Sequence, residues 1–214
     1  MRTVYHQIYD ALFQAFGPQN WWPAESVFEV VVGAVLTQNT SWSNVTKALD
    51  NLRVLDLLNF SALSQLGPDE IAPLIRPSGY YNIKARRLSN VLNMIVEEYD
   101  GQLDLFLREE CDIAREKLLA VKGVGPETAD SILLYACEQP VFVIDAYTHR
   151  VLHRHNLAPE ETDYHSLQEQ FLAALEPDVQ YFNEYHALLV KVASQYCKKR
   201  TPLCEQCPLR GVNL

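Results

Sequence analysis

Residues 118–130 read LLAVKGVGPETAD, with two glycines two positions apart between a leucine-rich segment and a second segment that opens with Pro126 and Glu127. Gly123 and Gly125 permit a tight turn because they carry no Cβ atom, and proline favours the first position of a helix. The pattern predicts two helices joined by a short hairpin whose backbone N–H groups face outward. The second helix presents its positive end beside Gly125, so an anion such as a phosphate can bind the amides directly. Taken alone, the turn is equally typical of ordinary helix packing.

Apolar residues recur at helical spacing along nearly the whole chain. Val4, Ile8, Leu12 and Phe16 predict an amphipathic helix that ends at Gly17-Pro18. Glycines and prolines, Pro73 among them, separate similar segments at 27–36, 45–52, 61–66, 85–99, 103–107, 113–119, 128–136, 146–153, 166–175 and 185–196. Only residues 140–144 (PVFVI) resemble a strand, and they are short enough for an extended loop. We expect an all-α protein of roughly ten short helices.

Composition limits the class of protein. The chain has 214 residues, 48% of them hydrophobic, which is enough for one large core or two small ones. Its formal net charge of −9 opposes long-range attraction to nucleic acid, although residues 191–214 carry five basic residues against one acidic residue, or +4. No window approaches the ~18 apolar residues of a membrane span, and the N-terminus lacks a signal-peptide core. We expect a cytoplasmic monomer with no membrane partner.

Several ordered motifs resemble one known family. Residues 118–129, followed by Val143-Ile144-Asp145 and by THRV at 148–151, are similar to the helix-hairpin-helix DNA glycosylases of the endonuclease III type. GAVLTQNT at 33–40, GYYNIKA at 79–85 and the C-terminal cysteines extend the resemblance over nearly the whole chain.

The resemblance implies a two-lobed, all-α fold. A six-helix barrel that includes the hairpin would take residues 22–133, while residues 1–21 and 134–214 would form a second helical domain. Damaged double-stranded DNA is the implied partner and would lie across the cleft between them. The candidate DNA contacts are then Lys122, Gly123 and Gly125 of the hairpin and Lys198, Lys199 and Arg200 of the tail.

Two acidic residues are candidates for catalysis. Cleavage of an N-glycosidic bond passes through an oxocarbenium-like sugar, so a carboxylate must stabilise that charge or activate water. Asp145 stands at the family's catalytic aspartate position, and its local pattern also suits a compatible role as a helix N-cap. Bifunctional members carry a lysine after the hairpin that forms a Schiff base. Here Glu127 stands there and cannot form an imine, which predicts a monofunctional enzyme, although Glu127 also suits the first turn of a helix.

The tryptophans suggest where a flipped base would bind. Trp21, Trp22 and Trp42 flank the apolar segment 27–36, and their faces suit the electron-poor ring of an N-alkylated purine. Together with the other motifs they resemble the 3-methyladenine branch, so an alkylated purine is the expected substrate. At least one of the three is expected to pack in the core.

Gln38 and Tyr80 stand at the family positions that wedge into the gap left by a flipped base. Oxidised pyrimidines and mismatched thymine stay open as substrates. A bifunctional glycosylase/AP lyase and a non-catalytic DNA-binding module are the alternative functions.

Cys197, Cys204 and Cys207 crowd into the last eighteen residues, which is not typical of a secreted disulfide framework. Their spacing resembles the family's iron–sulfur loop and implies a [4Fe-4S] cluster with a mainly structural role. Asn213 stands where the fourth cysteine is expected, which predicts an atypical or absent fourth ligand. A zinc site of three cysteines and a histidine is the alternative.

Overall fold

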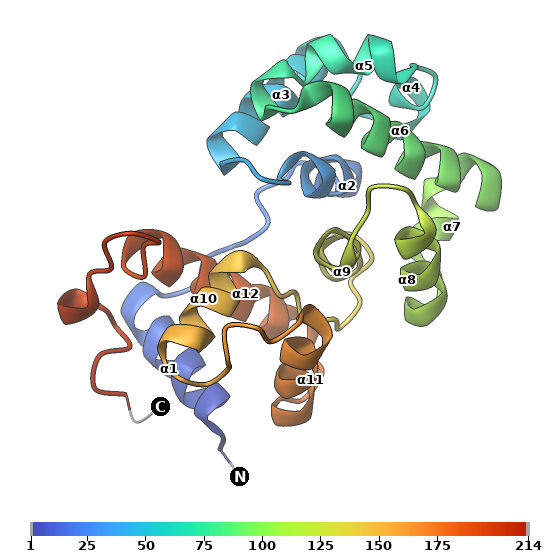
Figure 1. The fold of residues 1–214 in the computed structure, drawn as a ribbon. Coiled ribbons are helices and arrows are strands. Elements are labelled where there is room, and N and C mark those ends of the chain that lie inside the picture. Colours follow the sequence, from blue (N-terminus) through green and yellow to red (C-terminus); the bar gives the residue numbers. More distant parts are fainter. Residues whose placement is uncertain (1, 213–214) are drawn as a thin grey trace. The chain divides into compact units, whose positions relative to one another are not determined.

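The computed structural model describes residues 2–212, which form two compact units (Figure 1). One unit holds the residues up to Pro23 together with those from Pro140 onward, and the other holds Ala24–Gln139. The regular structure of the described residues is entirely helical, so the predicted all-α class is confirmed. The expected domain limits, 22–133 for the barrel, stay a prediction.

The Ala24–Gln139 unit is built around α2 (Val27–Leu36), in which every residue after Val27 is buried. A helix that is buried on all its faces must be surrounded by other elements. The helices in contact with it are α3 (Trp42–Val54), α6 (Tyr81–Glu98) and α9 (Pro126–Tyr135). Shorter elements complete the unit: α4 (Phe60–Leu63), α5 (Pro68–Leu74), the 3-10 helix η1 (Arg76–Ser78), α7 (Leu103–Leu107) and α8 (Cys111–Ala120).

Pro73 lies inside α5, so the break predicted at this proline is wrong. A proline within a helix removes one backbone hydrogen bond. Pro73 is the sixth residue of a seven-residue helix, which limits the loss, and the neighbouring Ile71 and Ala72 are buried as α5 packs on α6. Tertiary packing therefore overrides the local signal.

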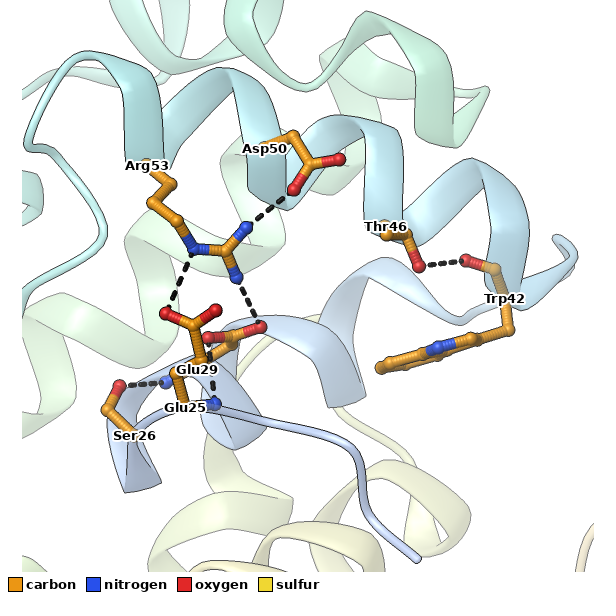
Figure 2. A network of polar contacts seen from close by, with 7 residues as sticks. All are labelled: Glu25, Ser26, Glu29, Trp42, Thr46, Asp50 and Arg53. Atoms are coloured by element: carbon orange, nitrogen blue, oxygen red, sulfur yellow. Dashed lines mark hydrogen bonds and ion pairs between the residues drawn. The ribbon is translucent and has the colours of Figure 1, made fainter.

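A network of ion pairs joins the start of α2 to the end of α3 (Figure 2). The Arg53 guanidinium lies 2.9 Å from Glu29, 3.4 Å from Glu25 and 2.5 Å from Asp50. Glu29 is buried, and its other oxygen accepts from the Glu25 N–H at 3.2 Å. These bonds stabilise a carboxylate that would be costly to bury alone. They also hold α3, which carries Trp42 at its opposite end.

In the other unit, α1 (Val4–Phe16) and α10 (Ala146–Arg154) pack against α12 (Val179–Gln195). The remaining elements are α11 (Tyr164–Ala174) and the 3-10 helix η2 (Cys204–Gln206). Helix α12 begins six residues before the predicted start at 185. Asp178 caps it, because its side chain accepts from the Tyr181 N–H at 2.7 Å.

Residues 140–144 are an extended, buried loop and not a strand. The Phe142 ring stacks on Phe171 at 3.9 Å between centroids, and the Gln168 side chain donates to the Phe142 carbonyl at 2.8 Å. A side chain thus replaces part of the bonding that a sheet would supply. The loop leads directly into Asp145.

Candidate active site and DNA-binding hairpin

Helices α8 and α9 form the predicted hairpin. Arg115 of α8 and Asp130 of α9 tie them together through two bonds, of 2.7 and 3.2 Å, and the Asp130 side chain is fully buried. The Val124 N–H closes the turn on the Val121 carbonyl at 3.0 Å. The bidentate Arg115–Asp130 pair holds α8 and α9 in a fixed orientation on either side of the turn.

The two hairpin glycines meet different constraints. Gly123 has φ +98°, and a Cβ there would collide with the Arg87 side chain, so the fold itself requires glycine. Gly125 caps α9 with φ −105°, which any residue adopts, and no atom lies within 4 Å of where its Cβ would stand. Both glycines are exposed, and within residues 2–212 neither of their N–H groups donates to a protein acceptor. The open space beside Gly125 suits the close approach of a ligand to the backbone.

Gln38 lies against the hairpin. Its amide nitrogen donates to the Gly123 carbonyl at 3.3 Å and to the Thr128 hydroxyl at 2.9 Å, and its oxygen accepts from Arg87. The side chain is half-buried. These bonds hold Gln38 beside the exposed turn, and its wedging role stays a prediction.

Next to the turn is a hollow of about 420 Å³ between α6 and the hairpin. It is lined by Ile83, Arg86, Arg87, Asn90, Lys122 and Gly123, and no carboxylate is among these residues. The Lys122 side chain is exposed, as expected for a phosphate contact or a solvated lysine, and its carbonyl accepts from Asn90 at 2.9 Å.

Tyr80 stands at the start of α6 with 72% of its surface exposed. Its φ of +45° is in the left-handed region, which is unfavourable for a residue other than glycine. An exposed aromatic side chain on a strained backbone matches the expected position of a wedge, which stays a prediction.

Asp145 is largely shielded from solvent, with 11% of its side chain exposed. It caps α10, with one oxygen accepting from the Thr148 N–H at 2.7 Å and the other 3.5 Å from His186 Nε2. Burial acts to raise the pKa of Asp145, but the hydrogen bond and charge of His186 and the Thr148 N–H outweigh it. The pKa of Asp145 therefore lies below its ordinary value. The N-cap predicted from the sequence is present, and catalysis by the same carboxylate stays a prediction.

His186 is the residue of this site that the sequence did not reveal. It lies on the buried face of α12 between Tyr185 and Ala187, with 8% of its side chain exposed. A histidine on an apolar helical face is more often packed in a core than functional, so its spacing gave no signal. Only the fold brings it to Asp145, forty-one positions earlier in the chain.

Glu127 lies in the first turn of α9 and is exposed. A carboxylate there is favourable on the helix dipole, which is the structural role considered from the sequence. The structure leaves its chemical role a prediction.

The three tryptophans belong to different units. The rings of Trp21 and Trp22 lie together, with centroids 5.4 Å apart, and both are half-buried. Trp42 opens α3 in the Ala24–Gln139 unit, and Figure 2 shows its indole turned back beneath that helix. A base pocket shared by all three stays a prediction.

The C-terminal cysteines lie in a loop held by two arginines of α10. Arg150 donates to the Cys197 carbonyl at 2.7 Å, and Arg154 lies 3.4 Å from the Cys197 sulfur. Arg154 also binds the carbonyls of the next two residues, and the side chains of Lys198, Lys199 and Arg200 are exposed.

Cys197, Cys204 and Cys207 lie within eleven residues of one another. Burial raises the pKa of the Cys207 thiol, a backbone hydrogen bond at Leu209 acts in the opposite direction, and Cys197 and Cys204 add to the increase. Among residues 2–212, however, no set of three His, Cys, Asp or Glu side chains is arranged to hold a metal ion. Asn213, the expected fourth position, lies outside the described residues.

Comparison with known proteins identifies the class. Residues 32–177 match the family described as HhH-GPD superfamily base excision DNA repair protein. The chain belongs to this superfamily and is one of its DNA repair glycosylases. No helix in the described part of the chain is long and apolar enough to cross a membrane.

Individual relatives cover almost the full chain. A Methanocaldococcus jannaschii protein assigned as a DNA repair glycosylase is 46% identical over 207 residues, which are 96% of this chain and 93% of the relative. Endonuclease III of Thermotoga maritima is 30% identical over 188 residues, which are 86% and 81% of the two chains.

Two solved structures are also similar to this chain. The crystal structure of H. pylori 3-methyladenine DNA glycosylase bound to 1,N6-ethenoadenine has a TM-score of 0.72 at 30% identity, covering 90% of this chain and 97% of the other. A trapped endonuclease III–DNA covalent intermediate shares the fold, with a TM-score of 0.81 at 20% identity and coverage of 98% and 94%.

Proposed function

We propose that this chain is a monofunctional DNA glycosylase that removes an alkylated purine, such as 3-methyladenine, from double-stranded DNA. The observation that carries the proposal is Asp145, a carboxylate largely shielded from solvent whose pKa is lowered by His186 and Thr148. It follows the hairpin at the distance that the family resemblance predicts.

The chemistry requires little beyond charge stabilisation. As the N-glycosidic bond breaks, its electron pair leaves with the base and the sugar becomes oxocarbenium-like. An ionised Asp145 beside the anomeric carbon would stabilise that positive charge. Water then adds to the anomeric carbon and loses a proton to solvent. An N-alkylated purine is cationic before cleavage and departs as a neutral base, so no strong general acid is needed.

Glu127 supports the monofunctional assignment. Lyase activity of the family type needs an amine at this position, and Glu127 is an exposed carboxylate at the helix start. We therefore expect no Schiff base and no strand cleavage by the enzyme itself.

The substrate class rests on the tryptophans and on one structural relative. Stacking and cation–π attraction to a tryptophan face are worth ~0.5–2 kcal/mol and favour a cationic purine. The relative solved with 1,N6-ethenoadenine is a 3-methyladenine DNA glycosylase and is 30% identical to this chain. Trp42→Ala is expected to weaken binding of damaged DNA more than binding of intact DNA, and equal losses would indicate a packing role.

A lesion panel tests the function. Duplexes carrying 3-methyladenine, an oxidised pyrimidine or a G·T mismatch are incubated with the protein, and the products are treated with hot alkali or with borohydride. We expect alkali-dependent cleavage of the alkylated duplex and no trapped adduct. A borohydride-trapped adduct would establish a lyase, and the absence of base release from every duplex would leave a DNA-binding module.

Asp145→Asn tests the carboxylate without removing the cap, because asparagine caps helices as well as aspartate does. We expect turnover to fall by about 10²–10³-fold or more while DNA affinity is retained. Asp163→Asn is the matched control, since Asp163 caps α11 through the Ser166 N–H at 3.1 Å. Normal turnover by Asp145→Asn would disprove the assignment.

For the C-terminal loop we propose a [4Fe-4S] cluster that uses Cys197, Cys204 and Cys207, with an atypical or absent fourth ligand. The guanidinium of Arg154 beside the Cys197 sulfur would stabilise a thiolate there. Iron content together with a visible absorption band of the purified protein would support the cluster. A colourless protein that contains zinc would exclude it.

A further inference from the structure

Lys84 is a buried cation outside the proposed active site. It lies on α6 with 1% of its surface exposed, and within the described residues no carboxylate forms an ion pair with it. Its ammonium donates to two backbone carbonyls instead, at 2.8 Å to Leu36 and 2.6 Å to Ser78. Burying a cation without a counter-charge is unfavourable, so a core that needed only volume would be better filled by an apolar side chain.

The two carbonyls terminate two different elements. Leu36 is the last residue of α2 and Ser78 is the last residue of η1. Terminal carbonyls of helices lack internal partners, and a cation at that end also interacts favourably with the dipole. One ammonium thus caps both elements and fixes the distance between the points where the chain leaves them.

The residues beyond those points are the two candidate wedges. Gln38 follows Leu36 by two positions, and Tyr80 follows Ser78 by two positions. Thr37 continues from Leu36 in helical backbone with φ −71°, and Gly79 carries the chain from Ser78 to Tyr80 through φ +70°. Because each connection is a single residue, the position of its anchored end limits where the following side chain can stand.

From this arrangement we infer that Lys84 is a positioning residue that sets the spacing of Gln38 and Tyr80 for insertion into the gap of a damaged duplex. The inference rests on the proposed function, because it assigns Lys84 to the same DNA-binding surface. Lys84 itself touches no DNA and acts only through the two segments.

The test compares Lys84→Met with Lys47→Met, an exposed lysine on α3 that serves as the control. Fluorescence anisotropy measures the affinity of each variant for a duplex with one tetrahydrofuran abasic site and for the intact duplex of the same sequence. We expect Lys84→Met to lose about tenfold of the preference for the abasic duplex, equivalent to 1.4 kcal/mol, with affinity for intact duplex unchanged within about twofold. A lower melting temperature with the preference intact would show a purely structural role and overturn the inference.

Double variants with Tyr80→Ala and Gln38→Ala make the test specific. If Lys84 acts through these side chains, its effect will be smaller when they are already absent, whereas fully additive losses would contradict the inference. If Tyr80→Ala and Gln38→Ala lower the preference for the abasic duplex and Lys84→Met does not, the inference about Lys84 is refuted while the DNA-wedge proposal is not. No preference for the abasic duplex in the wild type would refute the DNA-wedge proposal and the inference with it.

If Lys84→Met does not fold, the wild-type preference is measured from pH 7 to 9.5. A neutral amine makes weaker bonds to the two carbonyls, so the preference should fall above about pH 8. The Arg87 guanidinium, one turn along α6, acts on the Lys84 ammonium. The elements that pack against α6 carry further charged groups: Arg76 of η1 lies over the Tyr81 ring, Glu29 of α2 pairs with Arg53, and Asp69 and Glu70 of α5 are exposed. A constant preference up to pH 9.5 would overturn the inference.

Discussion

The two hairpin glycines allow a matched pair of substitutions. At Gly125 the backbone is unstrained and the space beside it is open, so Gly125→Ala should change the free energy of unfolding by no more than about 1 kcal/mol. Gly123→Ala forces alanine into φ +98° and against Arg87, which should lower the free energy of unfolding by roughly 2–4 kcal/mol.

Gly125→Ala should weaken DNA binding even though it barely changes the stability. A methyl group on Gly125 would hold a phosphate away from the N–H groups at the start of α9 and remove one charge-assisted hydrogen bond, worth roughly 1.5–3 kcal/mol. Affinity for duplex DNA should therefore fall roughly 10- to 100-fold in a variant of nearly normal stability. Urea denaturation measures the stability, and anisotropy at one fixed salt concentration measures the affinity.

The control for this experiment is the stability of the same Gly125→Ala preparation. If it binds duplex DNA as tightly as the wild type while remaining fully folded, the amides of this turn do not hold phosphate, and the reason given for glycine at this position is wrong. A large loss of stability in Gly125→Ala would equally contradict the open space found beside it.

Three further predictions concern buried charges. His186→Asn should move the acid limb of the pH–activity profile to higher pH, because His186 helps keep the pKa of Asp145 low; an unmoved limb would remove His186 from the site. Burial, with a contribution from Arg87, lowers the pKa of Lys84 from 10.5 to about 8, so between these values the unfolded chain holds a proton that the native chain releases. The free energy of unfolding should therefore gain a contribution that rises with pH over this interval, by roughly 3 kcal/mol in all, and urea denaturation of Lys84→Met should lack it. Arg53→Leu should destabilise the fold by roughly 3 kcal/mol by leaving Glu29 buried without its cation, whereas Arg210→Leu, which breaks the exposed pair with Glu205, should have little effect.

Local signals in the sequence predicted the parts of this fold that local physics controls. The limits of α1 follow from its apolar spacing and from Gly17, and the hairpin follows from Gly123, Gly125 and Pro126. The cap at Asp145 was likewise predictable, since an aspartate before a helix needs only the backbone that follows it.

The other parts of the fold and of the candidate site depend on contacts between residues that are far apart in the sequence. Residues 140–144 suit a strand or a loop equally well until Phe171 and Gln168, from a helix more than twenty positions away, supply their partners. His186 and Lys84 gain their importance only from groups that the fold brings to them. A polar side chain on an apolar helical face does not reveal its partner, so spacing alone could not identify either residue.

The contacts of Asp145 also decide which chemical role suits it. A general base works best when its pKa lies near the working pH, and the forces on Asp145 act in the other direction, since His186 and the Thr148 N–H both favour the ionised form. Such a carboxylate is a poor acceptor for a proton from water, yet it keeps its full negative charge when a positive sugar develops beside it. The helix that Asp145 caps therefore makes the residue weaker as a base and better suited to electrostatic stabilisation. We expect the rate of base release to stay constant above the pKa of Asp145 and to be nearly the same in H2O and D2O, because no proton leaves water as the glycosidic bond breaks. A clearly slower rate in D2O would instead indicate general-base catalysis.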